Sequence, residues 1–101
     1  MIVAFSVSPS GGDPDGGVSE AVARAVKVVR ESGLPNSTNA MFTNIEGESW
    51  EEVMDVVKRA VEAAGEGSSR VSLVLKADIR PGFSGQLDAK VDRIEAHLRD
   101  A

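Results

Sequence analysis

Two glutamates, Glu46 and Glu48, have the spacing that acid–base chemistry could use. They flank Gly47, so in an extended strand both carboxylates would lie on the same side, as general acid–base pairs sometimes require. Beside them the sequence offers no nucleophile or set of metal ligands, since it contains no cysteine and one histidine, His97. We therefore expect no catalytic residue and no metal site. A carboxylate here suits the binding of a cation or of a ligand that donates hydrogen bonds.

The glycine-rich segment Pro9 to Gly17 also resembles known binding loops. Asp13 and Asp15 could open a calcium loop, but the twelfth position counted from Asp13 is Arg24, where a bidentate glutamate is required. Its glycines precede a helix, as in phosphate-binding loops, yet the G-x-x-x-x-G-K pattern is missing and the aspartates would repel an anion. We expect a surface loop without either ligand.

Residues 49 to 52 begin a helix directly after the two glutamates. Ser49 can accept a hydrogen bond from the amide of Glu52 while the Glu52 carboxylate reaches back, which forms a capping box. Trp50, the only tryptophan, lies in the first turn of this helix. It could anchor the core or stack on a ligand, and its apolar mass favours the core.

Hydrophobic periodicity predicts the remaining elements. Alternation over residues 2–8 indicates a strand, and apolar residues at spacings of three and four indicate helices. The first predicted elements are a strand at 2–8, a helix at 18–32 ended by Gly33, and a hairpin at 36–48 with a break near 40–42. A second helix follows at 50–64, and its buried face consists of Trp50, Val53, Met54, Val57, Ala60, Val61 and Ala64. The last two elements are a strand at 70–80, with Val71, Leu73, Leu75, Ala77 and Ile79 inward, and a helix at about 84–98 with the apolar stripe Leu87, Val91, Ile94 and Leu98.

This order, βαββαβ followed by a helix, predicts a ferredoxin-like α+β plait: a four-stranded antiparallel sheet with two helices on one face, plus a C-terminal helix. The helices can cover only one face of such a sheet. The first and last strands should share the open face, with polar residues that meet water, a ligand or a second subunit. The polar residues are Ser6, Ser8, Ser72, Lys76, Asp78 and Arg80, interleaved with the apolar Ala4 and Val74.

Length and charge restrict the classes of function. With 101 residues the protein forms one domain, 1–101, and its net charge of −5 disfavours nucleic acid as a partner. The apolar N-terminal residues lack the basic flank and length of a signal peptide, and no apolar run is long enough to span a membrane. We expect a cytoplasmic protein.

The segment Met41-Phe42-Thr43-Asn44-Ile45-Glu46-Gly47-Glu48, followed by Trp50-Glu51-Glu52, resembles the small thiamine-binding proteins of ferredoxin-like fold, which typically carry Met-Gly-Thr, two apolar residues, Glu-Gly-Glu and Trp. The start at Ile2–Val7, the helix end at Glu31–Leu34 and the segment Arg70–Arg80 are similar to that family in the same order. The resemblance implies non-catalytic subunits that form homodimers and often homotetramers, with thiamine or its pyrimidine part as ligand and no further cofactor.

From this resemblance and the strand phase we expect a ligand pocket near a subunit interface. The residues expected to line it are Ser6, Ser8, Asn39, Met41, Thr43, Glu46, Trp50 and Asp78. The sequence departs from the family at Asn36, where an aromatic is usual, at Asn39-Ala40, where Thr-Pro is usual, and at Phe42, where glycine is usual. We expect Phe42 to narrow or reshape the pocket.

Two other functions fit the same fold. One is a structural or regulatory homo-oligomer whose polar sheet face is only an interface. The other is a small ferredoxin-like enzyme, such as an acylphosphatase-like hydrolase or a cofactor-free monooxygenase. An acylphosphatase would need an arginine in the loop after the first strand, and Pro9 to Gly17 contains no basic residue.

Overall fold

The computed structural model describes residues 1–10 and 18–99, so the aspartates and glycines expected to form a surface loop lie outside the described residues. Seven elements follow one another in the order β1 (Ile2–Pro9), α1 (Ser19–Glu31), β2 (Asn36–Thr38), β3 (Thr43–Glu46), α2 (Trp50–Ala64), β4 (Val71–Asp78) and α3 (Gln86–Arg99).

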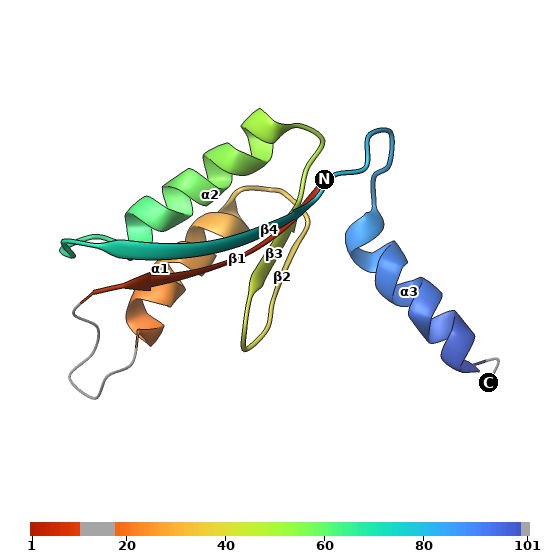
Figure 1. Cartoon of the computed structure of the whole chain (residues 1–101), viewed down its shortest axis with the longest axis horizontal. Coiled ribbons are helices and arrows are strands. Elements are labelled where there is room, and N and C mark those ends of the chain that lie inside the picture. Colours follow the sequence, from red (N-terminus) through yellow and green to blue (C-terminus); the bar gives the residue numbers. More distant parts are fainter. Residues whose placement is uncertain (11–17, 100–101) are drawn as a thin grey trace.

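The four strands form one antiparallel sheet in the order β2-β3-β1-β4. Helices α1 and α2 pack side by side over one of its faces, whereas α3 stands apart from them (Figure 1). This architecture confirms the predicted ferredoxin-like plait with an additional C-terminal helix.

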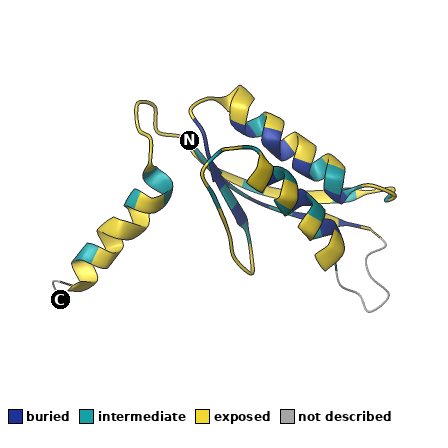
Figure 2. Cartoon of the chain, turned by 180° about the vertical axis from the view of Figure 1, so that it is seen from behind, coloured by how far each residue is buried: buried dark blue, intermediate teal, exposed yellow. Residues whose placement is uncertain are grey.

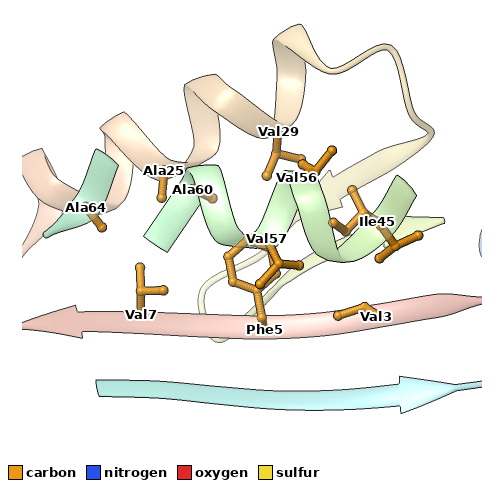
Figure 3. Packing of buried hydrophobic residues seen from close by; sticks show 11 residues of the cluster. Val3, Phe5, Val7, Ala25, Val29, Ile45, Val56, Val57, Ala60 and Ala64 are labelled. Carbon is orange, nitrogen blue, oxygen red and sulfur yellow. The ribbon is translucent and has the colours of Figure 1, made fainter. Parts of the chain in front are cut away.

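The core lies between β1 and the two covering helices (Figure 3). Alternate residues Val3, Phe5 and Val7 of β1 point toward α1 and α2 and are buried, as the period of two predicts. Burial of each such side chain stabilises the fold by roughly 1.5–3 kcal/mol. The helices bury small residues in return: Ala21, Ala25 and Val29 in α1, and Val53, Val56, Val57, Ala60 and Ala64 in α2.

Both ends of α2 are capped by side chains. Ser49 Oγ accepts a hydrogen bond from the Glu52 amide at 3.1 Å, and Glu52 Oε1 accepts one from the Glu48 amide at 3.2 Å. This confirms the predicted helix start, with the return bond reaching Glu48. At the other end Arg24 of α1 donates from Nε to the carbonyl of Ala63 at 2.9 Å, which ties the two helices together.

The structure corrects predictions about side-chain burial and about the end of β4. Trp50 is not a core anchor: it is 51% exposed, and Val56 takes a place in the core that the predicted face did not include. Strand β4 ends at Asp78, two residues early, because its partner β1 begins at Ile2 opposite Asp78 and only Met1 precedes it. Leu73 lies on the helix-covered face opposite Val7, as predicted, but is 42% exposed, and Ile79, which follows the strand, is 49% exposed.

Helix α3 projects from the body and buries none of its residues, all of which the structure describes (Figure 2). The Cα radius of gyration is therefore 15.1 Å, compared with about 13 Å for a compact domain of this length. The predicted apolar stripe is present, but Val91, Ile94 and Leu98 are exposed to solvent.

Candidate functional site

The strand register defines the open face of the sheet. Residues directly opposite each other in an antiparallel pair share a face, so Ala4 lies beside Asn44 and Lys76, and Ser6 lies beside Val74. The open face therefore carries Ile2, Ala4, Ser6, Ser8, Ser37, Asn44, Glu46, Ser72, Val74, Lys76 and Asp78. The predicted members are confirmed except for Arg80, which follows the strand and places its guanidinium over the Phe83 ring.

Two carboxylates of this face hold the start of α3. The side chain of Glu46 is buried, and its two oxygens accept hydrogen bonds from the amides of Gln86 and Leu87, each at 2.9 Å. Negative charge at a helix N-terminus is favourable because the free amides point toward it. Asp78 pairs with Lys90 of α3, and this hydrogen bond, together with the charge of Lys90, lowers the pKa of Asp78.

A hollow of about 220 Å³ opens at the edge of the sheet where β3 stops short of the end of β1. We call it the edge hollow. It lies between β1, the first half of α1 and the turn that joins β2 to β3. It is lined by Phe5, Ser6, Val7, Val18, Val22, Ala25, Val26, Thr38, Asn39, Ala40, Met41, Phe42 and Thr43.

The edge hollow has hydrogen-bonding groups but no ionisable side chain among its described lining residues. Strand β3 pairs with β1 only as far as Phe5, so Ser6 and Val7 pair with β4 alone. Successive residues of a strand direct their backbone groups to opposite edges. One of these two residues therefore presents an amide N–H and a carbonyl oxygen toward the hollow, where a planar heterocycle can pair with them.

The turn beside the edge hollow is held by one side chain. Asn39 Oδ1 accepts hydrogen bonds from the amides of Met41 and Phe42 at 2.9 and 3.0 Å, which closes the connection between β2 and β3. Met41 remains 73% exposed at the mouth. Thr43 is buried on the helix-covered face opposite Phe5, so it reaches the hollow from inside the sheet.

Four of the eight predicted site residues therefore meet at the edge hollow: Ser6, Asn39, Met41 and Thr43. The other four lie elsewhere. Ser8 is exposed on the open face, whereas Glu46 and Asp78 hold α3. Trp50 lines a separate hollow with the segment 79–84.

Sequence reasoning missed the contribution of α1 to the edge hollow. Periodicity assigns Val22, Ala25 and Val26 to the covered face of their helix, and that same placement also brings them to the hollow. Thr38 was missed as well, although it lies opposite the predicted Thr43. The signal that could have found Thr38 is its position beside the hairpin break.

A third hollow, which we call the wedge, separates the open face from α3. It has a volume of about 390 Å³ and is lined by Ile2, Ala4, Ser37, Asn39, Asn44, Lys76, Asp78, Leu87, Lys90 and Val91. Asn39 borders both the wedge and the edge hollow. The two spaces are therefore neighbours at the β2–β3 turn.

Two kinds of feature are absent from the described residues. They contain no group of three or more histidine, cysteine or acidic side chains arranged to hold a metal ion. Within the same residues, no helix combines the length and apolar character needed to cross a membrane.

Comparison with known proteins places the sequence in one family. Residues 3–95 match the family model described as thiamine-binding protein. A UPF0045 protein from Mycobacterium bovis is 53% identical over 98 residues, which cover 97% of this chain and 94% of that protein.

Solved structures show the same fold. A hypothetical protein from Methanocaldococcus jannaschii superposes with a TM-score of 0.81 at 29% identity, covering 93% of this protein and 94% of that one. A Thermotoga maritima protein named for thiamine biosynthesis or salvage superposes with a TM-score of 0.71 at 25% identity, covering 89% and 95%. With its family match over nearly the whole length, this chain belongs to the thiamine-binding protein family.

Proposed function

We propose that the protein is a non-catalytic binding protein that holds the pyrimidine part of thiamine in the edge hollow. Membership of the thiamine-binding family supports the ligand class, and the name of the Thermotoga maritima neighbour points in the same direction. The observation that carries the proposal is the hollow that gathers Ser6, Asn39, Met41 and Thr43 beside a strand edge to which no described strand pairs, and whose described lining residues carry no ionisable side chain.

The chemistry of the lining selects the neutral half of the ligand. An aminopyrimidine carries an amino donor next to a ring-nitrogen acceptor, which complements the backbone carbonyl and amide groups of a strand edge. The hollow is smaller than the roughly 300–1,000 Å³ of sites for drug-sized molecules, so it suits one ring. The cationic thiazolium would then extend past the sulfur of Met41 toward solvent.

The lining of the edge hollow also argues against a catalytic reaction on the bound ligand. General acid–base catalysis needs a titratable side chain within hydrogen-bond reach of the ligand. The described lining residues of the edge hollow supply hydroxyl, amide and apolar groups only. They also include no lysine or arginine for a diphosphate, so phosphorylation of the ligand should bring no gain in affinity.

We further propose that the protein works as a homo-oligomer with the binding site near a subunit interface. Asn39 supports this, because it borders both the edge hollow and the wedge beside the open face. A second subunit on the open face would therefore lie close to the bound ligand.

Calorimetric titration of the purified protein tests the ligand. We expect saturable binding of hydroxymethylpyrimidine and thiamine, with thiamine diphosphate no tighter than thiamine. An absence of binding by all three ligands to folded protein would refute a thiamine-related role. Tighter binding of thiamine diphosphate than of thiamine would instead indicate that the site lies on a basic part of the surface and not in the edge hollow.

A matched pair of serine variants tests the location of the site. Ser6 and Ser8 lie on the same face of β1, but only Ser6 lines the edge hollow. We expect Ser6→Ala to weaken binding about tenfold, as the loss of one hydrogen bond would do, and Ser8→Ala to leave it unchanged. The reverse result would place the ligand on the open face instead.

A further inference from the structure

The hollow beside Trp50 is larger than the edge hollow and the wedge. Its volume is about 540 Å³, within the roughly 300–1,000 Å³ typical of sites for small molecules. It lies between the start of α2 and the segment that joins β4 to α3, and it shares no described lining residue with the other two hollows. We call it the Trp50 hollow.

Three large apolar side chains are exposed in the Trp50 hollow. Trp50, Ile79 and Phe83 are each about half exposed, and all three line it. Single exposed apolar residues are ordinary on a protein surface, whereas several gathered around one concave surface mark a site of interaction. The Trp50 hollow therefore has the walls of a binding site.

Both aromatic walls are carried by well-defined backbone. Trp50 lies in the first turn of α2, directly after the capping box. Phe83 closes a turn in which its amide donates to the carbonyl of Arg80 at 3.2 Å, and Gly82 has the positive φ, +83°, that a type II turn requires at its third position. Walls that are already ordered spare a ligand the entropic cost of ordering them.

The positive charges beside the Trp50 hollow already have partners. The guanidinium carbon of Arg80 lies 3.6 Å from the centre of the Phe83 ring. The amino group of Met1 donates a hydrogen bond to the carbonyl of Gly47 at 2.6 Å. The contact of Arg80 also shows that an aromatic face in this hollow accepts a cation.

The negative charges of the Trp50 hollow have no such partners. Glu48 and Glu51 lie on either side of Trp50 in the sequence, and their carboxylates make no hydrogen bond or ion pair within the described residues. Carboxylates beside aromatic faces favour an alkylated ammonium group, whose charge the rings attract and whose alkyl groups bury apolar surface. An anion would meet the same carboxylates without a free basic side chain to offset them.

We propose that the Trp50 hollow is a second binding site, for a small organic cation with an alkylated ammonium group. The ammonium group lies against the exposed part of Trp50, with Glu48 and Glu51 as its counter-charges. The apolar part of the ligand packs against Ile79 and Phe83. This site selects positive charge, whereas the described lining of the edge hollow carries no ionisable side chain, so the proposal does not depend on the pyrimidine site.

Titration of choline into nitrogen-15-labelled protein, followed by NMR, tests the site. The control ligand is 3,3-dimethylbutan-1-ol, which has the same shape with carbon in place of the charged nitrogen. We expect choline to shift the indole N–H signal of Trp50 and the amide signals of Gly82 and Phe83 saturably. The neutral alcohol should bind at least about tenfold more weakly. Equal binding of the two ligands, or no saturable shift with choline, would overturn the proposal.

Variants of the two kinds of lining residue test how the cation is held. We expect the double variant Glu48→Gln/Glu51→Gln to weaken choline binding about tenfold, and Trp50→Leu to weaken it by at least as much. Trp50 is half exposed, so its replacement should leave the fold intact. Glu62→Gln is the matched control, because Glu62 is an exposed glutamate of α2 outside the hollow. Unchanged choline affinity in the double variant would refute the assigned counter-charges.

Competition with hydroxymethylpyrimidine distinguishes the two sites. We expect saturating hydroxymethylpyrimidine to leave the choline affinity unchanged, and choline to leave the amide signals of Asn39 and Met41 in place. Displacement of choline would put both ligands in one site and overturn a separate site at Trp50. Binding of choline by a protein that binds no pyrimidine would support the Trp50 site and refute only the function proposed above.

Discussion

Asp78 connects the sheet to α3 through a single ion pair. Its carboxylate bonds to Lys90 and lies near Arg80 and Lys76, all of which lower its pKa below the ordinary value of 3.8. A lowered pKa means that the pairing stabilises the folded state fully above pH 3.8 and that this contribution disappears as the pH falls through the folded value. The contribution is small because both side chains are exposed.

We expect a carbon-13 titration of the Asp78 carboxyl by NMR to give a midpoint below 3.8 in the wild type. Lys90→Met removes the hydrogen bond and the nearest charge, so it should move the midpoint upward. Identical midpoints in the two proteins would show that the pair is not formed in solution.

Gly47 is a residue at which backbone space is tightly restricted. A β-carbon there would lie 2.5 Å from Val53 Cγ2 and 2.8 Å from Glu52 Oε1, although its backbone angle is not one that requires glycine. We expect Gly47→Ala to lower the free energy of unfolding by about 1–3 kcal/mol, as overpacking commonly does.

Chemical denaturation of Gly47→Ala, Val53→Ala and the double variant isolates the cause of that loss. Val53→Ala removes the clashing methyl, so the double variant should lose less stability than the sum of the two single losses. Strict additivity would mean that the backbone moves and the clash is not formed.

Among the elements, α3 depends most on a side chain that belongs to another element. Glu46 at the end of β3 accepts two amides of α3, and glutamine could accept only one of them while presenting a donor to the other. We expect Glu46→Gln to lower the free energy of unfolding by about 1–3 kcal/mol and to accelerate amide exchange at Gln86 and Leu87.

Glu48→Gln is the matched control for this capping role. Glu48 is an exposed glutamate two residues away, and its carboxylate makes no hydrogen bond within the described residues. Its substitution should change neither the stability nor the exchange in α3. Unchanged exchange at Gln86 and Leu87 in Glu46→Gln would contradict the assigned role of Glu46.

At the scale of the whole molecule, the sequence predicts the helices and strands better than it predicts what each side chain packs against. The alternation of Val3, Phe5 and Val7 identifies both β1 and its buried face, because a strand has only two faces. Trp50 shows the limit of the same reasoning. Its spacing to Val53 and Val57 places it on the buried stripe of α2, yet its position in the first turn puts it beside the segment 79–84, away from the sheet.

The candidate site was predictable to the extent that it depends on one hairpin. Asn39, Met41 and Thr43 surround the break that polar and apolar composition predict, and the structure brings them together. The contribution of α1 depends on how far β3 extends along β1, which is a long-range register that no local pattern specifies. Likewise, the stripe of α3 indicates that something covers the helix but does not identify it.

Trp50 is exposed, so its intrinsic fluorescence can report changes in its surroundings. The only tryptophan shares a hollow with Ile79, Pro81 and Phe83, on the segment that connects β4 to α3. Any change in the angle of α3 must be accommodated in that segment, so it alters the solvent around the indole. A dilution series followed by intrinsic fluorescence should therefore report a movement of α3 that accompanies association of the subunits, with no label and no substitution. An emission maximum that stays constant while sedimentation shows dissociation would mean that α3 keeps its angle in the monomer.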